Sequence, residues 1–176
     1  LIVRSTISDN TTSRDGGGLL TINSMTLISS TISGNISERH GGGISIIDAN
    51  DEVIRIFSST IVNNSANIGF GGGIYNADYN SVSSRFADVY LANSIVADNT
   101  APSNYNRNVY QVHSQGYNLF SSLEDDSLLT EATTDIIANP QLDPLADNGG
   151  FTQTHLPLST SPAIDAIPDC TGFEQQ

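Results

Sequence analysis

Short apolar stretches recur along the chain, and within them apolar and polar side chains broadly alternate. The longer ones are MTLISSTIS (25–33), VIRIFSSTIV (53–62) and DVYLANSIV (88–96), which are rich in β-branched and aromatic residues. Shorter pieces alternate with them, namely LLTI (19–22), ISII (44–47) and IYN (74–76). No stretch sustains the i, i+3, i+4, i+7 stripe of an amphipathic helix. The pattern therefore predicts an all-β chain of short strands.

These stretches belong to an internal repeat. Its landmark is STISDN (5–10), STISGN (30–35), STIVNN (59–64) and SIVADN (94–99), with offsets of 25, 29 and 35 residues. Glycine triplets follow at positions 16, 41 and 71, with nearly the same period. A period in this range without helices predicts a solenoid whose coils stack at about 4.8 Å, that is, a single-stranded parallel β-helix. Stacking would place Ile7, Ile32, Ile61 and Val96 in one inward column and Thr6, Thr31 and Thr60 in an outward one.

The two invariant landmarks of the repeat have different expected roles. The asparagines should form a hydrogen-bonded ladder along the axis at one bend, because side-chain amides can satisfy polar groups that a bend leaves unpaired. The glycines that open each triplet should supply the positive φ of a sharp turn. The predicted ladder is Asn10, Asn35, Asn64 and Asn99, and the predicted turn residues are Gly16, Gly41 and Gly71.

Successive coils become longer because polar residues are inserted at 48–52 and 76–88. Each insertion follows the short apolar piece that comes after the glycine triplet, ISII (44–47) or IYN (74–76). Insertions in a solenoid gather on one side and often carry its function. We therefore expect ligand contacts from the aromatic and basic residues in and beside the longer insertion, Tyr75, Tyr79, Arg85 and Phe86, with Tyr105 as a further aromatic contact.

Charge narrows the possible partners. Nineteen acidic residues against six basic ones give a formal net charge of −13, every basic residue is Arg, and ten acids but no base follow Arg107. Nucleic acid and anionic membranes are poor partners for such a surface. The single Cys170 allows no internal disulfide, and no apolar run approaches the length of a membrane span. Because the chain opens within a repeat, we expect it to be a fragment or mature portion of a longer protein.

The repeat STISGN…GGGI resembles the secreted, right-handed parallel β-helix proteins of the pectin-lyase-like superfamily, in particular bacterial surface proteins with polymorphic-outer-membrane-protein-like repeats. GYNLFSS (116–122) followed by ANPQLDPLADNGGFTQTHLPLSTSPAIDA (138–166) is similar to the closing signature of choice-of-anchor Q domain proteins. The resemblance covers most of the chain and implies a right-handed helix and a secreted or cell-surface location in a bacterium. After Ala166 the sequence departs from the family pattern, so the attachment chemistry stays open.

The resemblance and the repeat together suggest two parts. Residues 1–120 would form the coils, and residues 121–176 an acidic, proline-containing cap that protects the open end of the helix. The apolar side chains expected to lie over the last coil are Leu142, Leu145, Phe151, Leu156, Leu158 and Ile164.

Three functional hypotheses remain. The first is a non-enzymatic, adhesin-like surface module that presents its loops to a glycan or a protein. The second is a polysaccharide lyase or glycoside hydrolase, whose candidate groups would be Asp48, Asp51, Glu52 and Asp78 with Arg55 or Arg85; none of these stands in a recognisable catalytic motif. The third is a structural domain stabilised by Ca²⁺ or adapted to salt. His40, His113 and His155 lack metal-ligand spacing, so we expect no metal ligands among them and no other cofactor.

Overall fold

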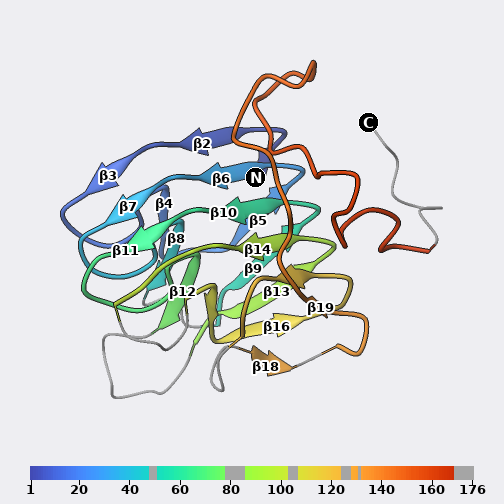
Figure 1. Cartoon of the computed structure of the whole chain (residues 1–176). Helices are drawn as coiled ribbons and strands as arrows, with labels where there is room; N and C mark the ends of the chain where they lie inside the picture. Colours follow the sequence, from blue (N-terminus) through green and yellow to red (C-terminus); the bar gives the residue numbers. More distant parts are fainter. Residues whose placement is uncertain (48–50, 78–85, 103–106, 124–127, 131, 169–176) are drawn as a thin grey trace.

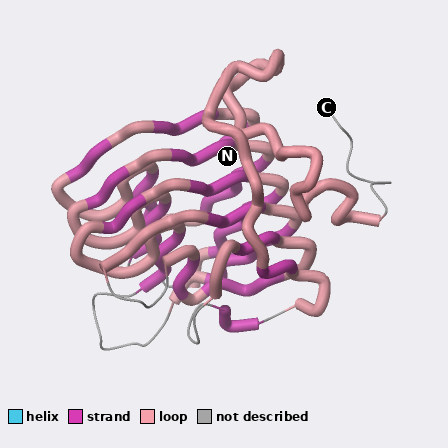
Figure 2. Tube along the Cα trace, in the orientation of Figure 1, coloured by secondary structure: helices cyan, strands magenta, loops and turns pink. Residues whose placement is uncertain are grey.

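The computed structural model describes residues 1–47, 51–77, 86–102, 107–123, 128–130 and 132–168. These residues form short strands and no helix, and every pairing between the named strands is parallel. The strands lie in four sheets, and the chain passes through the sheets in turn before it returns to the first (Figures 1 and 2). One such passage, which corresponds to one coil of the repeat, is called a circuit. The prediction of an all-β chain with parallel pairing is therefore confirmed.

The sheets are named here A to D in the order in which the chain meets them. Sheet A contains β1 (Ile2–Val3), β5 (Met25–Ile28), β9 (Val53–Phe57), β13 (Asp88–Ala92), β16 (Val112–Ser114) and β18 (Leu128–Thr130). Sheet B contains β2 (Thr6–Ser8), β6 (Thr31–Ser33), β10 (Thr60–Val62), β14 (Ile95–Ala97), β17 (Leu119–Phe120) and β19 (Ile136–Ile137). Sheet C contains β3 (Thr11–Thr12), β7 (Ile36–Ser37) and β11 (Ser65–Ala66). Sheet D contains β4 (Leu19–Thr21), β8 (Ile44–Ile47), β12 (Ile74–Ala77) and β15 (Val109–Tyr110).

The core lies between the sheets and is built from the inward residue of each strand. The register joins Ile7 to Ile32, Ile32 to Ile61 and Ile61 to Val96, as the repeat predicts. The last three of these side chains are 0% exposed. Ladder pairing continues to Ile137, so strands extend beyond the boundary expected at residue 120.

The predicted asparagine positions are joined by hydrogen bonds at the bend between sheets B and C. The Nδ2 group of Asn10 donates to Oδ1 of Asn35 at 3.0 Å, and Asn35 donates to Asn64 at 2.9 Å. Asn64 then donates to Asn99 at 3.0 Å. Each Oδ1 also accepts the main-chain N–H of the preceding asparagine in the series. In Asn35, Asn64 and Asn99, both the NH₂ group and the oxygen of the side-chain amide therefore form hydrogen bonds along the axis.

The ladder has a fifth member that the sequence repeat does not reveal. Asn99 donates to Oδ1 of Asn108 at 3.1 Å, although the two residues lie only nine positions apart. Asn108 is next to Gly73 across the strand ladder, so it stands where earlier circuits have the third glycine of the triplet. It donates in turn to the hydroxyl group of Ser121 and to the main-chain oxygen of Ser122, which follow β17. The side-chain amide of Asn108 therefore occupies the ladder position for which the next circuit supplies no asparagine.

A second polar ladder marks the corner between sheets A and B. The main-chain N–H groups of Ser5, Ser30 and Ser59 each donate to the serine Oγ one circuit further on. The series continues through Ser94 and Asn118 to Asp135. Two separate corners are therefore held by buried side-chain hydrogen bonds rather than by backbone geometry alone.

The glycine triplet combines three different requirements. Gly41 has φ +64°, a conformation that favours glycine. A Cβ at Gly42 would lie 2.5 Å from the main-chain oxygen of Gly72, and a Cβ at Gly43 would lie 3.1 Å from Nδ2 of Asn64. The first glycine thus permits the turn, and the second permits backbone contact between circuits. The third makes room for the asparagine ladder and also for the backbone of the next circuit, since its Cβ would lie 2.6 Å from the main-chain oxygen of Gly73.

The C-terminal segment, residues 138–168, is here called the strap. It runs from β19 back along the outer face of sheet B to the first circuit (Figure 1). The hydroxyl of Thr6 donates to the main-chain oxygen of Gln153 at 2.7 Å, and Ser33 Oγ lies 2.8 Å from Nε2 of His155. Thr31, predicted to face solvent, is consequently only 4% exposed.

The expectation that the apolar side chains of the strap cover the last coil is wrong for four of the six residues named above. Phe151 is 97% exposed, and Leu156, Leu158 and Ile164 are also exposed. The outer face of sheet B offers hydroxyl groups, and the strap meets them with main-chain and histidine groups. The contact is thus partly polar, which an argument based on hydrophobicity could not find.

Candidate functional site

Two of the predicted ligand contacts, Tyr75 and Phe86, lie within the described residues. Tyr79, Arg85 and Tyr105 lie outside the described residues. Tyr75 is only 6% exposed, and Phe86 is half-buried just before β13. Of the predicted contacts that the structure describes, neither therefore presents a freely accessible ring.

Tyr75 belongs instead to an aromatic stack on the outer face of sheet D. Its ring lies 4.4 Å from that of His40 and 5.5 Å from that of Tyr110, and Phe70 stacks on both His40 and Tyr110. Burial, together with the neighbouring Tyr110 and Asp15, raises the pKa of Tyr75 to about 12. The phenol is therefore neutral at physiological pH, and the stack is a packing feature.

His40 takes part in this stack as a neutral base. The main-chain N–H of Phe70 donates to Nδ1 of His40 at 3.0 Å, which requires that this nitrogen carry no proton. Burial lowers the pKa of His40 below its ordinary value of 6.5, although the nearby Asp15 acts in the opposite direction. The histidine that precedes the glycine triplet thus has a structural role that the sequence pattern does not show.

The outer face of sheet A has a different character. A single row across its strands consists of Thr26, Arg55, Tyr90, His113 and Thr130, which pair from one circuit to the next, with a register shift between Val112 and His113 where β16 meets β18. This set is called the sheet A row. Arg55 is exposed, and the rings of Tyr90 and His113 stack with their centroids 5.4 Å apart. The alternate residues Ile54, Ile56, Val89, Leu91 and Val112 are 0% exposed and fix these strands on the core.

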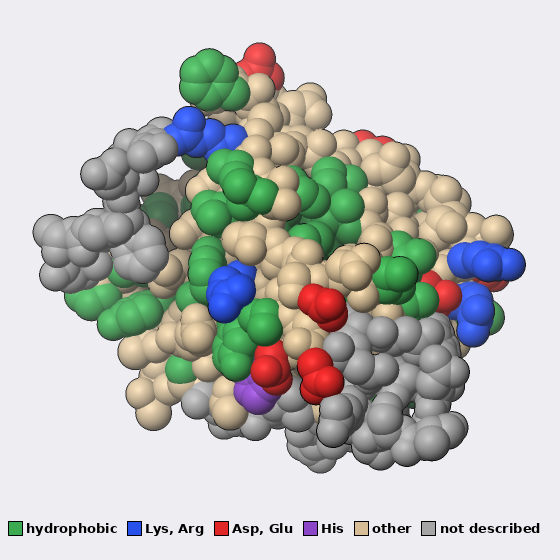
Figure 3. All heavy atoms as spheres, turned by 180° about the vertical axis from the view of Figure 1, so that it is seen from behind, with side chains coloured by type: hydrophobic (Ala, Val, Ile, Leu, Met, Phe, Trp, Pro, Cys, Tyr) green, Lys and Arg blue, Asp and Glu red, His purple; other side chains and the backbone are tan. Residues whose placement is uncertain are grey.

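Charged and apolar groups flank the row on opposite sides. Asp88 Oδ1 lies 4.0 Å from Nε2 of His113, and the Asp88 side chain is 60% exposed. Glu52 accepts a hydrogen bond from the main-chain N–H of Ser24 at 2.9 Å. The side seen in Figure 3 shows a basic side chain, acidic side chains and a histidine close together among apolar groups. Towards the other end of the strands the register aligns Ile28, Phe57 and Ala92.

The row lies on strands that follow the two insertions. The insertions separate sheet D from sheet A, and β9 and β13 begin directly after them. The sequence pattern does not single out the row as a set, although it gives Arg55 as a catalytic candidate. The available signal was the alternation in VIRIF and DVYLA, which places Arg55 and Tyr90 at the same outward position of successive repeats.

The candidates for acid-base chemistry are only partly visible. Asp48, Asp78 and Arg85 lie outside the described residues. Within the ranges that the structure describes, no three His, Cys, Asp or Glu side chains gather in a way that could hold a metal ion. What the sheet A row does offer is a guanidinium, a phenol and an imidazole on adjacent strands, about 4.8 Å apart.

Comparisons of the chain with protein-family models, curated proteins and solved structures found no match. The part of the chain with described structure contains no helix of the length and apolarity needed to cross a membrane.

Proposed function

We propose that the chain forms a right-handed, single-stranded parallel β-helix of the pectin-lyase-like superfamily, related to choice-of-anchor Q domain proteins. In this proposal it is an exported bacterial surface module without enzymatic activity, and it binds a glycan across the sheet A row. The row is the observation that carries the proposal.

Three properties of the row support a glycan as the ligand. Its residues stand in register across successive parallel strands, so equivalent positions repeat along the axis as sugar units repeat along a chain. Arg55 donates hydrogen bonds in a fixed plane, and Tyr90 combines an apolar ring with a hydroxyl group. Asp88 and Glu52 lie beside the row and can accept hydrogen bonds from sugar hydroxyls. The net charge of −13 favours neutral over polyanionic glycans.

The test is a glycan array probed with the protein and with Arg55→Ala and Tyr90→Ala variants. Controls are Arg14→Ala and Phe151→Ala, which remove an exposed arginine and an exposed aromatic ring elsewhere. We expect each row variant to weaken binding to the recognised glycan about fivefold or more, because the few contacts that cost more than about 1 kcal/mol on truncation are enriched in Tyr and Arg. The controls should bind as the parent does. Equal binding by all four variants would reject the row as the site.

A second candidate function is polysaccharide cleavage, and the adjacency of Arg55, Tyr90 and His113 is the observation that favours it. In β-elimination a base removes the proton α to a carboxyl group, and the glycosidic oxygen then leaves with the bonding electrons and is protonated. Tyr90 or His113 could exchange these protons, while Arg55 could hold the carboxylate. Incubating each bound glycan and analysing it by mass spectrometry separates the two functions. Shortened products that are lost in Tyr90→Phe would favour the enzyme.

A further inference from the structure

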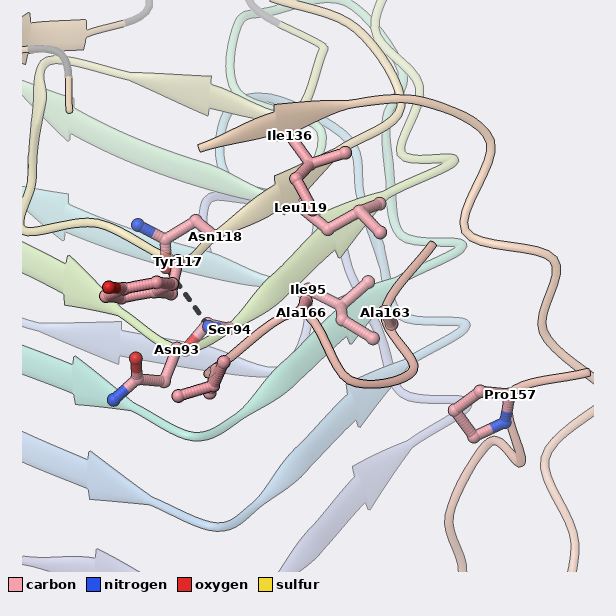
Figure 4. Close-up of a pocket in the computed structure, with 11 residues that line it drawn as sticks. Asn93, Ser94, Ile95, Tyr117, Asn118, Leu119, Ile136, Pro157, Ala163 and Ala166 are labelled. Atoms are coloured by element: carbon pink, nitrogen blue, oxygen red, sulfur yellow. Dashed lines mark hydrogen bonds between the residues drawn. The ribbon is translucent and has the colours of Figure 1, made fainter. Parts of the chain in front are cut away.

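A cavity lies between the strap and the outer face of sheet B, away from the sheet A row. Its volume is about 200 Å³. One wall consists of Ile95, Leu119 and Ile136, which are aligned in three successive circuits. The strap contributes the opposite wall through Pro157, Ala163, Ala166 and Ile167 (Figure 4).

The polar groups of the cavity gather at one end. Tyr117 and Asn93 lie side by side there, and their hydroxyl and amide groups point away from Pro157 (Figure 4). Neither side chain has a hydrogen-bond partner in the described part of the chain, whereas Ser94 and Asn118, which also line the cavity, are used by the corner ladder. The cavity is therefore apolar along its length and has two available polar groups at its end.

We propose that this cavity binds a small neutral ligand that consists of one aromatic ring and one hydroxyl or amide group. The size follows from comparison with known cavities: about 150 Å³ accommodates benzene, and drug-sized ligands occupy pockets of about 300 Å³ or more. The neutrality follows from the lining, which contains no charged side chain. The hydroxyl or amide group of the ligand would pair with Tyr117 and Asn93, and the ring would lie against Ile95 and Leu119.

The experiment uses benzyl alcohol, toluene and benzoate as probes of the full chain, with dissociation constants from titrations followed by NMR. We expect benzyl alcohol to bind more tightly than toluene, and benzoate not to bind. Tyr117→Phe removes one hydroxyl without changing the ring, so it should weaken benzyl alcohol about three- to tenfold and leave toluene unchanged. Tyr110→Phe is the matched control on sheet D and should change neither constant.

A second variant tests the location. Ala163→Phe fills the cavity from the strap and should abolish binding of both benzyl alcohol and toluene. If this variant loses its fold, Tyr117→Phe still decides the question. Absence of binding at millimolar probe, or equal weakening of both probes by Tyr117→Phe, would overturn the proposal. Because the row variants and the cavity variants do not overlap, failure of glycan binding leaves this result unaffected.

Discussion

Replacing a central ladder residue should cost far more stability than replacing the terminal one. Asn64 is fully buried, and its amide donates to Asn99 and to the main-chain oxygens of Ile32 and Val62. Its Oδ1 accepts the main-chain N–H and the Nδ2 group of Asn35 at 3.0 and 2.9 Å. Asn64→Ala therefore removes bonds on both sides and leaves a buried main-chain donor without an acceptor.

The magnitude follows from these contacts. A buried donor without a partner costs about 1–3 kcal/mol, and each remaining lost bond contributes about 1 kcal/mol net, partly recovered by relaxation. We expect Asn64→Ala to lower the free energy of unfolding by about 3–5 kcal/mol. Asn10 is exposed, and its amide donates only to Asn35 and to the main-chain oxygen of Ser8. Because water can replace these bonds, Asn10→Ala should cost about 1 kcal/mol or less.

The assay is urea unfolding at pH 7, followed by far-ultraviolet circular dichroism. Asn93→Ala is not a suitable control, because Asn93 has φ +53° and a backbone effect would be mixed with the side-chain effect. Asn23→Ala, at an exposed position between β4 and β5, is preferable. Equal destabilisation by Asn64→Ala and Asn10→Ala would show that cooperative burial along the ladder does not contribute as reasoned.

Three further predictions concern the turn, the aromatic stack and the strap. Gly42→Ala should cost at least about 2 kcal/mol, since its Cβ would lie 2.5 Å from backbone atoms of the next circuit, whereas Gly150→Ala, with the nearest atom 3.8 Å away, should be nearly neutral in the same urea titration. Folding lowers the pKa of His40, so the neutral side chain contributes its full stability above the ordinary pKa of 6.5, and this stability is lost as the pH falls below that value. The free energy of unfolding, measured from pH 8 to 5, should therefore decline less in His40→Phe than in the parent protein. An identical decline in the two proteins would contradict the assignment. Ser33→Ala leaves Nε2 of His155 without a donor, so the strap should open more readily, by about 1–2 kcal/mol, and hydrogen exchange should increase in β6 but not in β8.

The repeat made the architecture predictable because each circuit imposes the same local requirements. Strand positions, the inward column and four ladder asparagines follow from spacing alone, since parallel stacking brings equivalent residues together. Asn108 could not be found in this way. It replaces a glycine in one circuit and reaches the ladder position of the next, so its role depends on a neighbour that lacks an asparagine.

The candidate site was less predictable for a related reason. The sequence predicts Tyr75 as a ligand contact because it is an aromatic residue beside an insertion. Its ring is instead stacked on His40, which lies thirty-five residues earlier and on a different part of the circuit. The strap was expected at the end of the helix because its prolines prevent continued pairing. Its actual path depends on hydroxyl groups of sheet B that look, in the sequence, like ordinary solvent-facing residues.

The sheet A row is the strongest candidate for a binding site because the outer faces of the other sheets are covered, packed or short. The strap lies over sheet B, and the outer face of sheet D carries stacked rings whose central member is nearly buried. Sheet C consists of two-residue strands. Sheet A has the longest described strands, and Arg55 and Asp88 are exposed on it. A single outward substitution in β9 or β13 can change this face without disturbing the alternate inward residues, so the proposed binding face can vary while the ladders preserve the fold.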